Sequence, residues 1–192
     1  MARLLLTMAV ALALVLAVPL EPLAHESPVD HVDRSIRIWI SGETIHLSYQ
    51  LQLSERAAMM QLTKMDSDAD GVISERERDA YFSSFADALS KQLHLQIENR
   101  NLELKRDGKV QLQPQFRQVF TFTASCGTLA KGKHPGRLND EYSRSYPGVY
   151  RWDGPKVDVG TGPRVIVTDA PKAADAAGHA GTLQLKFEIA VP

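Results

Sequence analysis

Two kinds of hydrophobic spacing divide this chain. Apolar and polar residues alternate on both sides of a turn at 41–43, which predicts a β-hairpin with one face in a core. The alternating apolar residues are Ile36, Ile38 and Ile40 before the turn, and Ile45, Leu47, Tyr49, Leu51 and Leu53 after it. From Ser54 the spacing becomes helical, which predicts one helix from Ser54 to Met65 and a second from Glu75 to about His94. The expected inner faces carry Ala58, Leu62 and Met65 on the first helix, and Tyr81, Phe82, Phe85 and Leu89 on the second.

Strand spacing returns after the second helix. Alternating apolar residues predict strands around 95–104, 110–112, 119–124, 164–168 and 183–189. The pattern weakens from Ser125 to Gly162, where Gly and Pro are frequent, so we expect a long loop region there with room for one short strand. Residues 171–181 are typical of a flexible connector. The expected fold class is therefore α+β, an antiparallel sheet or small sandwich with a helix-loop-helix inserted at 54–93.

The N-terminus is typical of a secretory signal peptide. Arg3 precedes fifteen residues without a charge, Leu4 to Val18, which is short for a membrane span. Cleavage after Ala24 would give a signal peptide of residues 1–24 and one exported domain of residues 25–192. Cleavage after Ala17 and an uncleaved N-terminal anchor remain alternatives. Export predicts a periplasmic or secreted protein, with no membrane span once the signal is removed.

Composition narrows the class of protein. The 192-residue chain has a net charge of -1 and 44% hydrophobic residues, which is ordinary globular composition and excludes a strongly basic nucleic-acid binder. Its single cysteine, Cys126, cannot form an internal disulfide, and we expect a small buried side chain. No set of nucleophile, base and acid, no Gly-rich phosphate loop and no Cys/His cluster can be recognised, so the sequence favours a protein that is not an enzyme.

One motif carries recognisable chemistry. Residues 66–77 read DSDADGVISERE, with carboxylates at loop positions 1, 3, 5 and 12 and a glycine at position 6. Alternate side chains of a chain that wraps a cation point inward, and Gly71 permits the positive φ that reverses the chain. Hard oxygen ligands in this pattern suit Ca²⁺. The expected metal ligands are Asp66, Asp68, Asp70, the Val72 carbonyl, Ser74 and Glu77.

From Ser54 to Leu89 the chain resembles the EF-hand calcium-binding family. It departs from the family at Arg78, where an apolar residue is common, and in having no second loop to pair with. We therefore expect Ile73, at loop position 8, to pack against the β-domain or a second copy of the chain. A single hand implies a structural or low-affinity calcium site for a calcium-rich compartment, with dissociation constants of about 10⁻⁴ to 10⁻³ M.

A second hypothesis concerns the mature N-terminus. His25 and His31 could bind a transition metal such as copper, although a frayed polar terminus is the simpler interpretation. The order of elements also resembles the exported regions of bacterial nickel/cobalt permease-like and HupE/UreJ-like proteins, which implies an envelope accessory of a metal transporter. The aromatic residues Tyr142, Tyr146, Tyr150 and Trp152 could bind a partner or pin a long loop. The expected partners are a calcium ion and a protein of the cell envelope.

Overall fold

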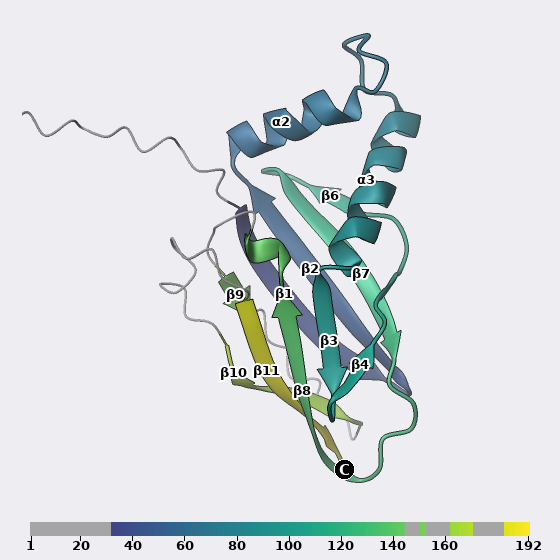
Figure 1. Ribbon diagram of the computed structural model, residues 1–192, viewed down its shortest axis with the longest axis vertical. Coiled ribbons are helices and arrows are strands. Elements are labelled where there is room, and N and C mark those ends of the chain that lie inside the picture. Colours follow the sequence, from purple (N-terminus) through teal and green to yellow (C-terminus); the bar gives the residue numbers. More distant parts are fainter. Residues whose placement is uncertain (1–31, 145–149, 153–161, 171–182) are drawn as a thin grey trace, which may run out of the picture.

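The computed structural model describes residues 32–144, 150–152, 162–170 and 183–192 (Figure 1). The predicted signal peptide, His25, His31, Tyr146 and the connector lie outside the described residues. Two β-sheets form a sandwich, and two helices cover one end of it, which confirms the α+β class. The helices are α2 (Glu55–Met65) and α3 (Glu75–Ser90), and both lie between β2 and β3 in the chain.

The first sheet has the strand order β5-β7-β2-β1-β9, with β6 also paired to β7. Its strands are β1 (Val32–Ser41), β2 (Thr44–Leu53), β5 (Lys105–Arg106), β6 (Gln111–Gln113), β7 (Arg117–Ser125) and β9 (Tyr150–Trp152). The predicted hairpin is β1 and β2, in antiparallel register with Ile38 opposite Leu47. All five alternating apolar residues of β2 are buried, because they face the second sheet.

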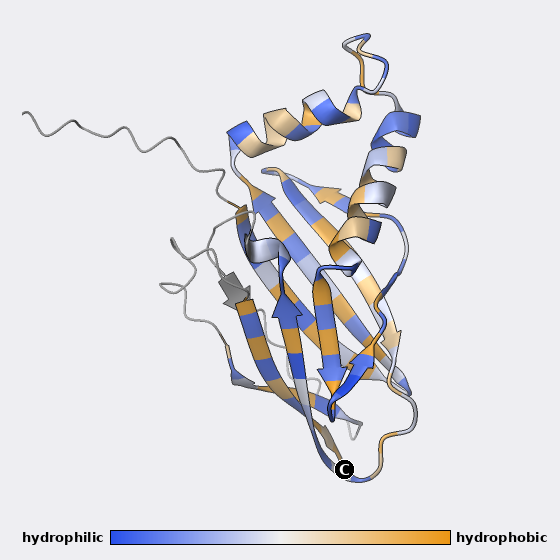
Figure 2. Ribbon diagram, viewed as in Figure 1, coloured by the Kyte–Doolittle hydropathy of each residue, from blue (hydrophilic) through white to orange (hydrophobic). Residues whose placement is uncertain are grey.

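The second sheet has the order β10-β11-β8-β3-β4. Its strands are β3 (Leu93–Ile97), β4 (Arg100–Leu102), β8 (Gly132–Asp140), β10 (Arg164–Asp169) and β11 (Leu183–Val191). A short 3-10 turn, η1 (Tyr142–Arg144), follows β8. Figure 2 shows hydrophobic and hydrophilic residues alternating along β1, β2, β3 and β11, as a two-layer core requires, whereas β8 is mostly hydrophilic.

The prediction of a long loop region from 125 to 162 was wrong over β8. This nine-residue strand lies between β11 and β3 and pairs with both. Its inward positions are His134, Gly136, Leu138 and Asp140, only one of which is a large apolar residue. Gly136 is required there, because a Cβ would overlap the Phe187 ring and lie 2.9 Å from Ile97 Cδ1. The strand therefore has no hydrophobic alternation for a sequence pattern to detect.

The two helices differ in part from their predicted faces and ends. On α2, Ala57, Ala58 and Met65 are buried, whereas Leu62 is 41% exposed at the margin of that face. Helix α3 ends at Ser90 and not near His94, because Leu93 already begins β3. The ring centroid of Phe85 on α3 lies 5.3 Å from that of Phe120 on β7 and 5.8 Å from that of Tyr142. Helix α3 is thus fixed to the sandwich by the expected aromatic face.

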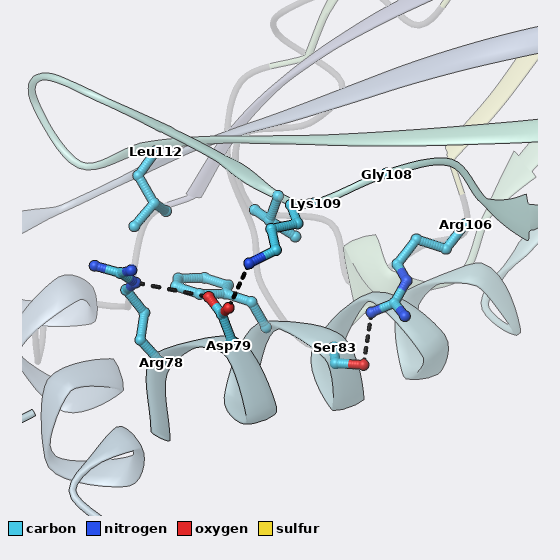
Figure 3. Close-up of a pocket in the computed structure, with 9 residues that line it drawn as sticks. Arg78, Asp79, Ser83, Arg106, Gly108, Lys109 and Leu112 are labelled. Carbon is cyan, nitrogen blue, oxygen red and sulfur yellow. Dashed lines mark hydrogen bonds and ion pairs between the residues drawn. The ribbon is translucent and has the colours of Figure 1, made fainter. Parts of the chain in front are cut away.

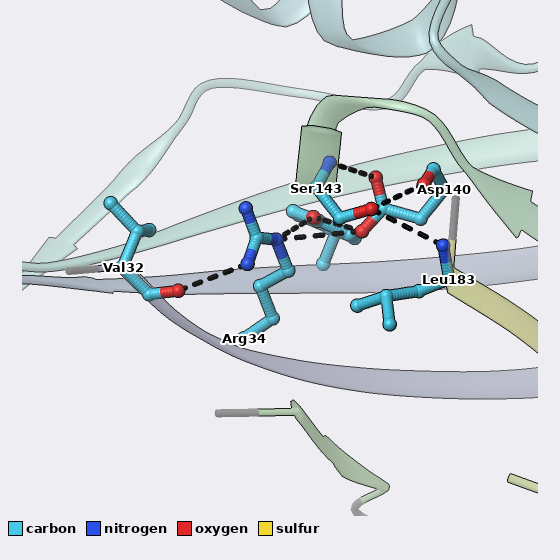
Figure 4. A network of polar contacts seen from close by, with 6 residues as sticks. Val32, Arg34, Asp140, Ser143 and Leu183 are labelled. Atoms are coloured by element: carbon cyan, nitrogen blue, oxygen red, sulfur yellow. Dashed lines mark hydrogen bonds and ion pairs between the residues drawn. The ribbon is translucent and has the colours of Figure 1, made fainter. Parts of the chain in front are cut away.

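A buried polar network joins the two sheets (Figure 4). The Tyr49 hydroxyl of β2 donates to Asp140 Oδ2 over 2.6 Å, and Arg34 Nε of β1 donates to the same hydroxyl over 3.0 Å. Arg34 Nε also lies 3.5 Å from Asp140 Oδ2. Ser143 donates its backbone N–H to Asp140 Oδ1 and accepts from the Leu183 N–H. Arg34 and Asp140 are each 1% exposed, and their opposite charges compensate each other at this buried position.

Candidate metal centre

The candidate loop, residues 66–77, runs from the end of α2 into the capped first turn of α3. Helix α2 ends at Met65, and the Asp66 N–H still donates to the Leu62 carbonyl over 3.2 Å. Ser74 is the N-cap of α3, and its hydroxyl accepts from the Glu77 N–H over 3.2 Å. The Glu77 carboxylate in turn accepts a hydrogen bond from the Ser74 backbone N–H, which completes a capping box. Loop positions 1 and 9 are thereby fixed at the two helix ends.

Three of the predicted ligands converge. Carboxylate oxygens of Asp66, Asp68 and Asp70 all lie within 4.8 Å of one another. Backbone donors hold them in place: Asp66 accepts from the Asp70 and Gly71 N–H groups, at 3.1 and 3.0 Å. Asp68 accepts from the Asp70 N–H at 3.3 Å, and Asp70 from the Val72 N–H at 2.7 Å. These bonds set three like charges close together, an arrangement that a cation would stabilise.

The loop turns through two residues in the left-handed region. Ala69, at loop position 4, has φ of +58°, and Gly71, at position 6, has φ of +83°. The expectation of a positive φ at Gly71 is confirmed. Because alanine has a Cβ, the left-handed conformation at Ala69 is unfavourable by about 1 kcal/mol of free energy. Sequence reasoning missed this second turning point, because alanine carries no preference for it.

Glu77, at loop position 12, bonds to two serines of the same loop. Its Oε1 accepts from the Ser67 N–H at 2.8 Å and the Ser67 hydroxyl at 2.9 Å. Its Oε2 accepts from the Ser74 N–H at 3.0 Å and the Ser74 hydroxyl at 2.8 Å. These bonds, first those from Ser74 and then those from Ser67, lower the pKa of Glu77 to about 2. The carboxylate at position 12 is therefore ionised and tied to position 2 of the same loop.

The remaining predicted ligands occupy the same loop. The Val72 side chain is apolar and 67% exposed, so the backbone carbonyl is the group through which this residue could bind an ion. Ser74 is engaged with Glu77 in the capping box. Ile73 is partly buried against a core cluster that contains residues of both helices and both sheets, so its packing on the β-domain stays a prediction. The structure thus groups Asp66, Asp68 and Asp70, while Ser74 and Glu77 bond to each other.

This donor set fits a hard cation. Every candidate side-chain ligand is a carboxylate or hydroxyl oxygen, and no candidate ligand in the described loop offers sulfur or imidazole nitrogen. The carboxylates are largely exposed, so an ion could reach them without unfolding the domain. Calcium accepts six to eight oxygens in a flexible shell, whereas magnesium demands a tight octahedron.

Outside the loop, the structure places polar groups that sequence reasoning left unassigned. His134 is 7% exposed, with Nδ1 2.7 Å from Glu98 Oε1 and Nε2 2.7 Å from the Ala130 carbonyl oxygen. These two acceptors raise its pKa, with the hydrogen bond to the Ala130 carbonyl as the largest single cause. Cys126 is 2% exposed as expected, and burial raises the pKa of its thiol. Tyr142 is buried against Phe85, so this member of the aromatic group fastens a loop.

Comparison with known proteins identifies no relative: no family model, curated protein or solved structure matches this chain. Over the part of the chain that the structure describes, no helix is both long enough and apolar enough to cross a membrane.

Proposed function

We propose that this chain is an exported calcium-binding protein in which loop 66–77 takes one Ca²⁺. The observation that carries the proposal is the convergence of Asp66, Asp68 and Asp70 within 4.8 Å, at the loop positions that an EF-hand uses. The Val72 carbonyl, Ser74 and Glu77 would complete the shell. Glu77 is the ligand that must move, because it is bonded to Ser67 and Ser74.

The ion would act structurally or as a low-affinity signal for a partner. The loop is a single hand whose position 8, Ile73, packs on the same domain. The core between the sheets does not include the loop carboxylates, so the sandwich has no need of the ion to fold. Calcium would instead fix how α2 and α3 meet, at dissociation constants of about 10⁻⁴ to 10⁻³ M.

Isothermal titration calorimetry on the calcium-stripped protein tests the proposal. We expect one calcium site, a calcium-dependent rise in melting temperature, and weak substitution by Mg²⁺. Glu77→Gln should remove most of that rise and leave the ion-free protein folded. Asp87→Asn is the matched control, because Asp87 is an exposed acid on α3 outside the loop. No heat and no melting shift at about 10 mM calcium, above the range of extracellular calcium modules, would refute the calcium site.

A further inference from the structure

A cavity of about 250 Å³ lies between α3 and the edge segment 105–113 of the first sheet (Figure 3). We name it the α3–β6 cavity. Its lining includes Arg78, Asp79 and Phe82 from α3 and Arg106, Lys109 and Leu112 from the edge segment. The Lys109 side chain is 87% exposed, so the cavity opens at the surface.

Positive charge exceeds negative charge in this cavity. Lys109 Nζ lies 2.7 Å from Asp79 Oδ2, and Arg78 Nε lies 3.9 Å from Asp79 Oδ1. A guanidinium nitrogen of Arg106 donates to the Ser83 hydroxyl over 2.6 Å. Within the described residues, no carboxylate pairs with Arg106. Arg78 also lies 3.8 Å from Oε1 of Glu75, an exposed carboxylate outside the lining. Three cations therefore face one lining carboxylate and one exposed neighbour, which leaves a net positive charge complementary to an anion.

Apolar groups lie beside these charges. Phe82 is 6% exposed and belongs to the core, whereas Leu112 is 50% exposed although it lines the cavity. A bare inorganic anion would leave Leu112 uncovered. A ligand that carries apolar groups next to its acidic groups would cover Leu112 and pair with the cations at the same time.

The edge segment can also pair with a strand. Of the strands that the structure describes, β5 and β6 pair only with β7, so they form one margin of the first sheet. An extended peptide can add to such an edge, where backbone hydrogen bonds supply affinity and side-chain sites supply specificity. Charged residues such as Lys109 also protect an edge against unwanted pairing. The sign of the charge then selects which peptide can approach.

We propose that the α3–β6 cavity binds an acidic peptide segment of a partner protein. The segment adds as an extended strand beside β6, sets carboxylates against Arg78, Arg106 and Lys109, and covers Leu112 with an apolar side chain. Arg78 directly follows Glu77 in the first turn of α3, so calcium at the loop would steady one wall of the cavity. The peptide site itself stands on the cavity and does not rest on the calcium proposal.

Fluorescence anisotropy tests the site with a short fluorescein-labelled peptide of alternating Glu and Val, titrated in calcium and in EGTA. We expect saturable binding with a Kd below about 1 mM, and no binding of the corresponding Lys-Val peptide. Lys109→Glu should weaken binding by about tenfold, and Asp79→Asn, which removes the competing carboxylate, should tighten it by about threefold. Leu112→Ser should weaken it without lowering the melting temperature, because Leu112 is half exposed.

Lys131→Glu is the matched control, with the same charge change. Lys131 precedes Gly132, which pairs with Val191 at the far end of the sandwich from the helices. Three results would overturn the proposal: no binding of the acidic peptide, equal weakening by Lys109→Glu and Lys131→Glu, or displacement of the peptide by inorganic phosphate at equal concentration. The last result would identify a bare anion site. If the peptide does not bind but calcium does, the peptide site is refuted and the calcium proposal stands. If the peptide binds but calcium does not, the calcium proposal is refuted and the peptide site stands.

Discussion

Glu77 Oε1 accepts two hydrogen bonds from Ser67, one from its backbone N–H at 2.8 Å and one from its hydroxyl at 2.9 Å. These bonds join loop position 12 to loop position 2 of the candidate calcium loop. A carboxylate that binds an ion with both oxygens has to give up part of this arrangement. The Ser67 hydroxyl therefore stabilises the ion-free loop in competition with calcium.

Ser67→Ala should tighten calcium binding. The substitution removes the hydroxyl donor but keeps the backbone donor, so only part of the competition is lost, and we expect a gain of about threefold. Calorimetry with Ca²⁺ measures it. Ser84→Ala is the control, because Ser84 is an exposed serine on α3 outside the loop. A weaker affinity in Ser67→Ala would mean that the hydroxyl supports the bound state instead.

The two left-handed residues of the loop should respond in opposite directions to a change of side chain. Ala69→Gly relieves the left-handed strain at φ of +58°, and should raise the free energy of unfolding by at most about 0.5 kcal/mol after the entropy of glycine is counted. Gly71→Ala introduces the same strain at φ of +83°. It should therefore lower the free energy of unfolding by about 1 kcal/mol. Urea unfolding of the calcium-loaded variants measures both. Equal effects of the same sign would contradict the loop conformation.

Removing the buried Asp140 carboxylate between the two sheets should lower the free energy of unfolding. Asp140→Asn leaves the Arg34 guanidinium, 1% exposed, without the carboxylate that faces it at 3.5 Å. We expect a loss of about 3 kcal/mol in the free energy of unfolding. Tyr49→Phe, which removes only the bridging hydroxyl, should cost about 1 to 2 kcal/mol. Denaturant unfolding measures both, with Asp87→Asn as the exposed control, and a near-neutral Asp140→Asn would rule out an ionised pair.

His134 should make stability depend on pH. Its two nitrogens face the Ala130 carbonyl and the Glu98 carboxylate, which raise its pKa, while burial and then Arg100 act in the opposite direction. Because the folded pKa lies above the unfolded value of about 6.5, the stabilisation is complete below that value and is lost as pH rises through the folded pKa. The melting-temperature difference between the native protein and His134→Gln should be largest near pH 5 and shrink at alkaline pH. Glu98→Gln should lower the His134 pKa measured by NMR titration, and an unchanged value would contradict the contact.

The sequence predicted most of the described secondary structure where one face of an element is apolar. The β1–β2 hairpin, α2 with its Ser54 cap, and the aromatic face of α3 all have periodicities that local patterns express. The turn at Gly71 was also predictable, because a loop reversal of this kind favours glycine. The six candidate ligands follow from spacing alone, and their role in binding calcium stays a prediction.

Only the tertiary structure decided the rest, because the contacts join residues far apart in the chain. Strand β8 directs His134, Gly136 and Asp140 inward, and these residues fit there because of Glu98, Phe187 and Arg34, each on another strand or turn. Likewise, Arg106 and Lys109 reach α3 only because segment 105–113 folds back along β7 beside it. Periodicity predicted the elements that have one apolar face, because it is a property of neighbouring residues, and it missed β8, which has none. Which polar side chains pair with one another could be read only from the tertiary structure, because hydrogen bonds and ion pairs depend on distances that no local pattern encodes.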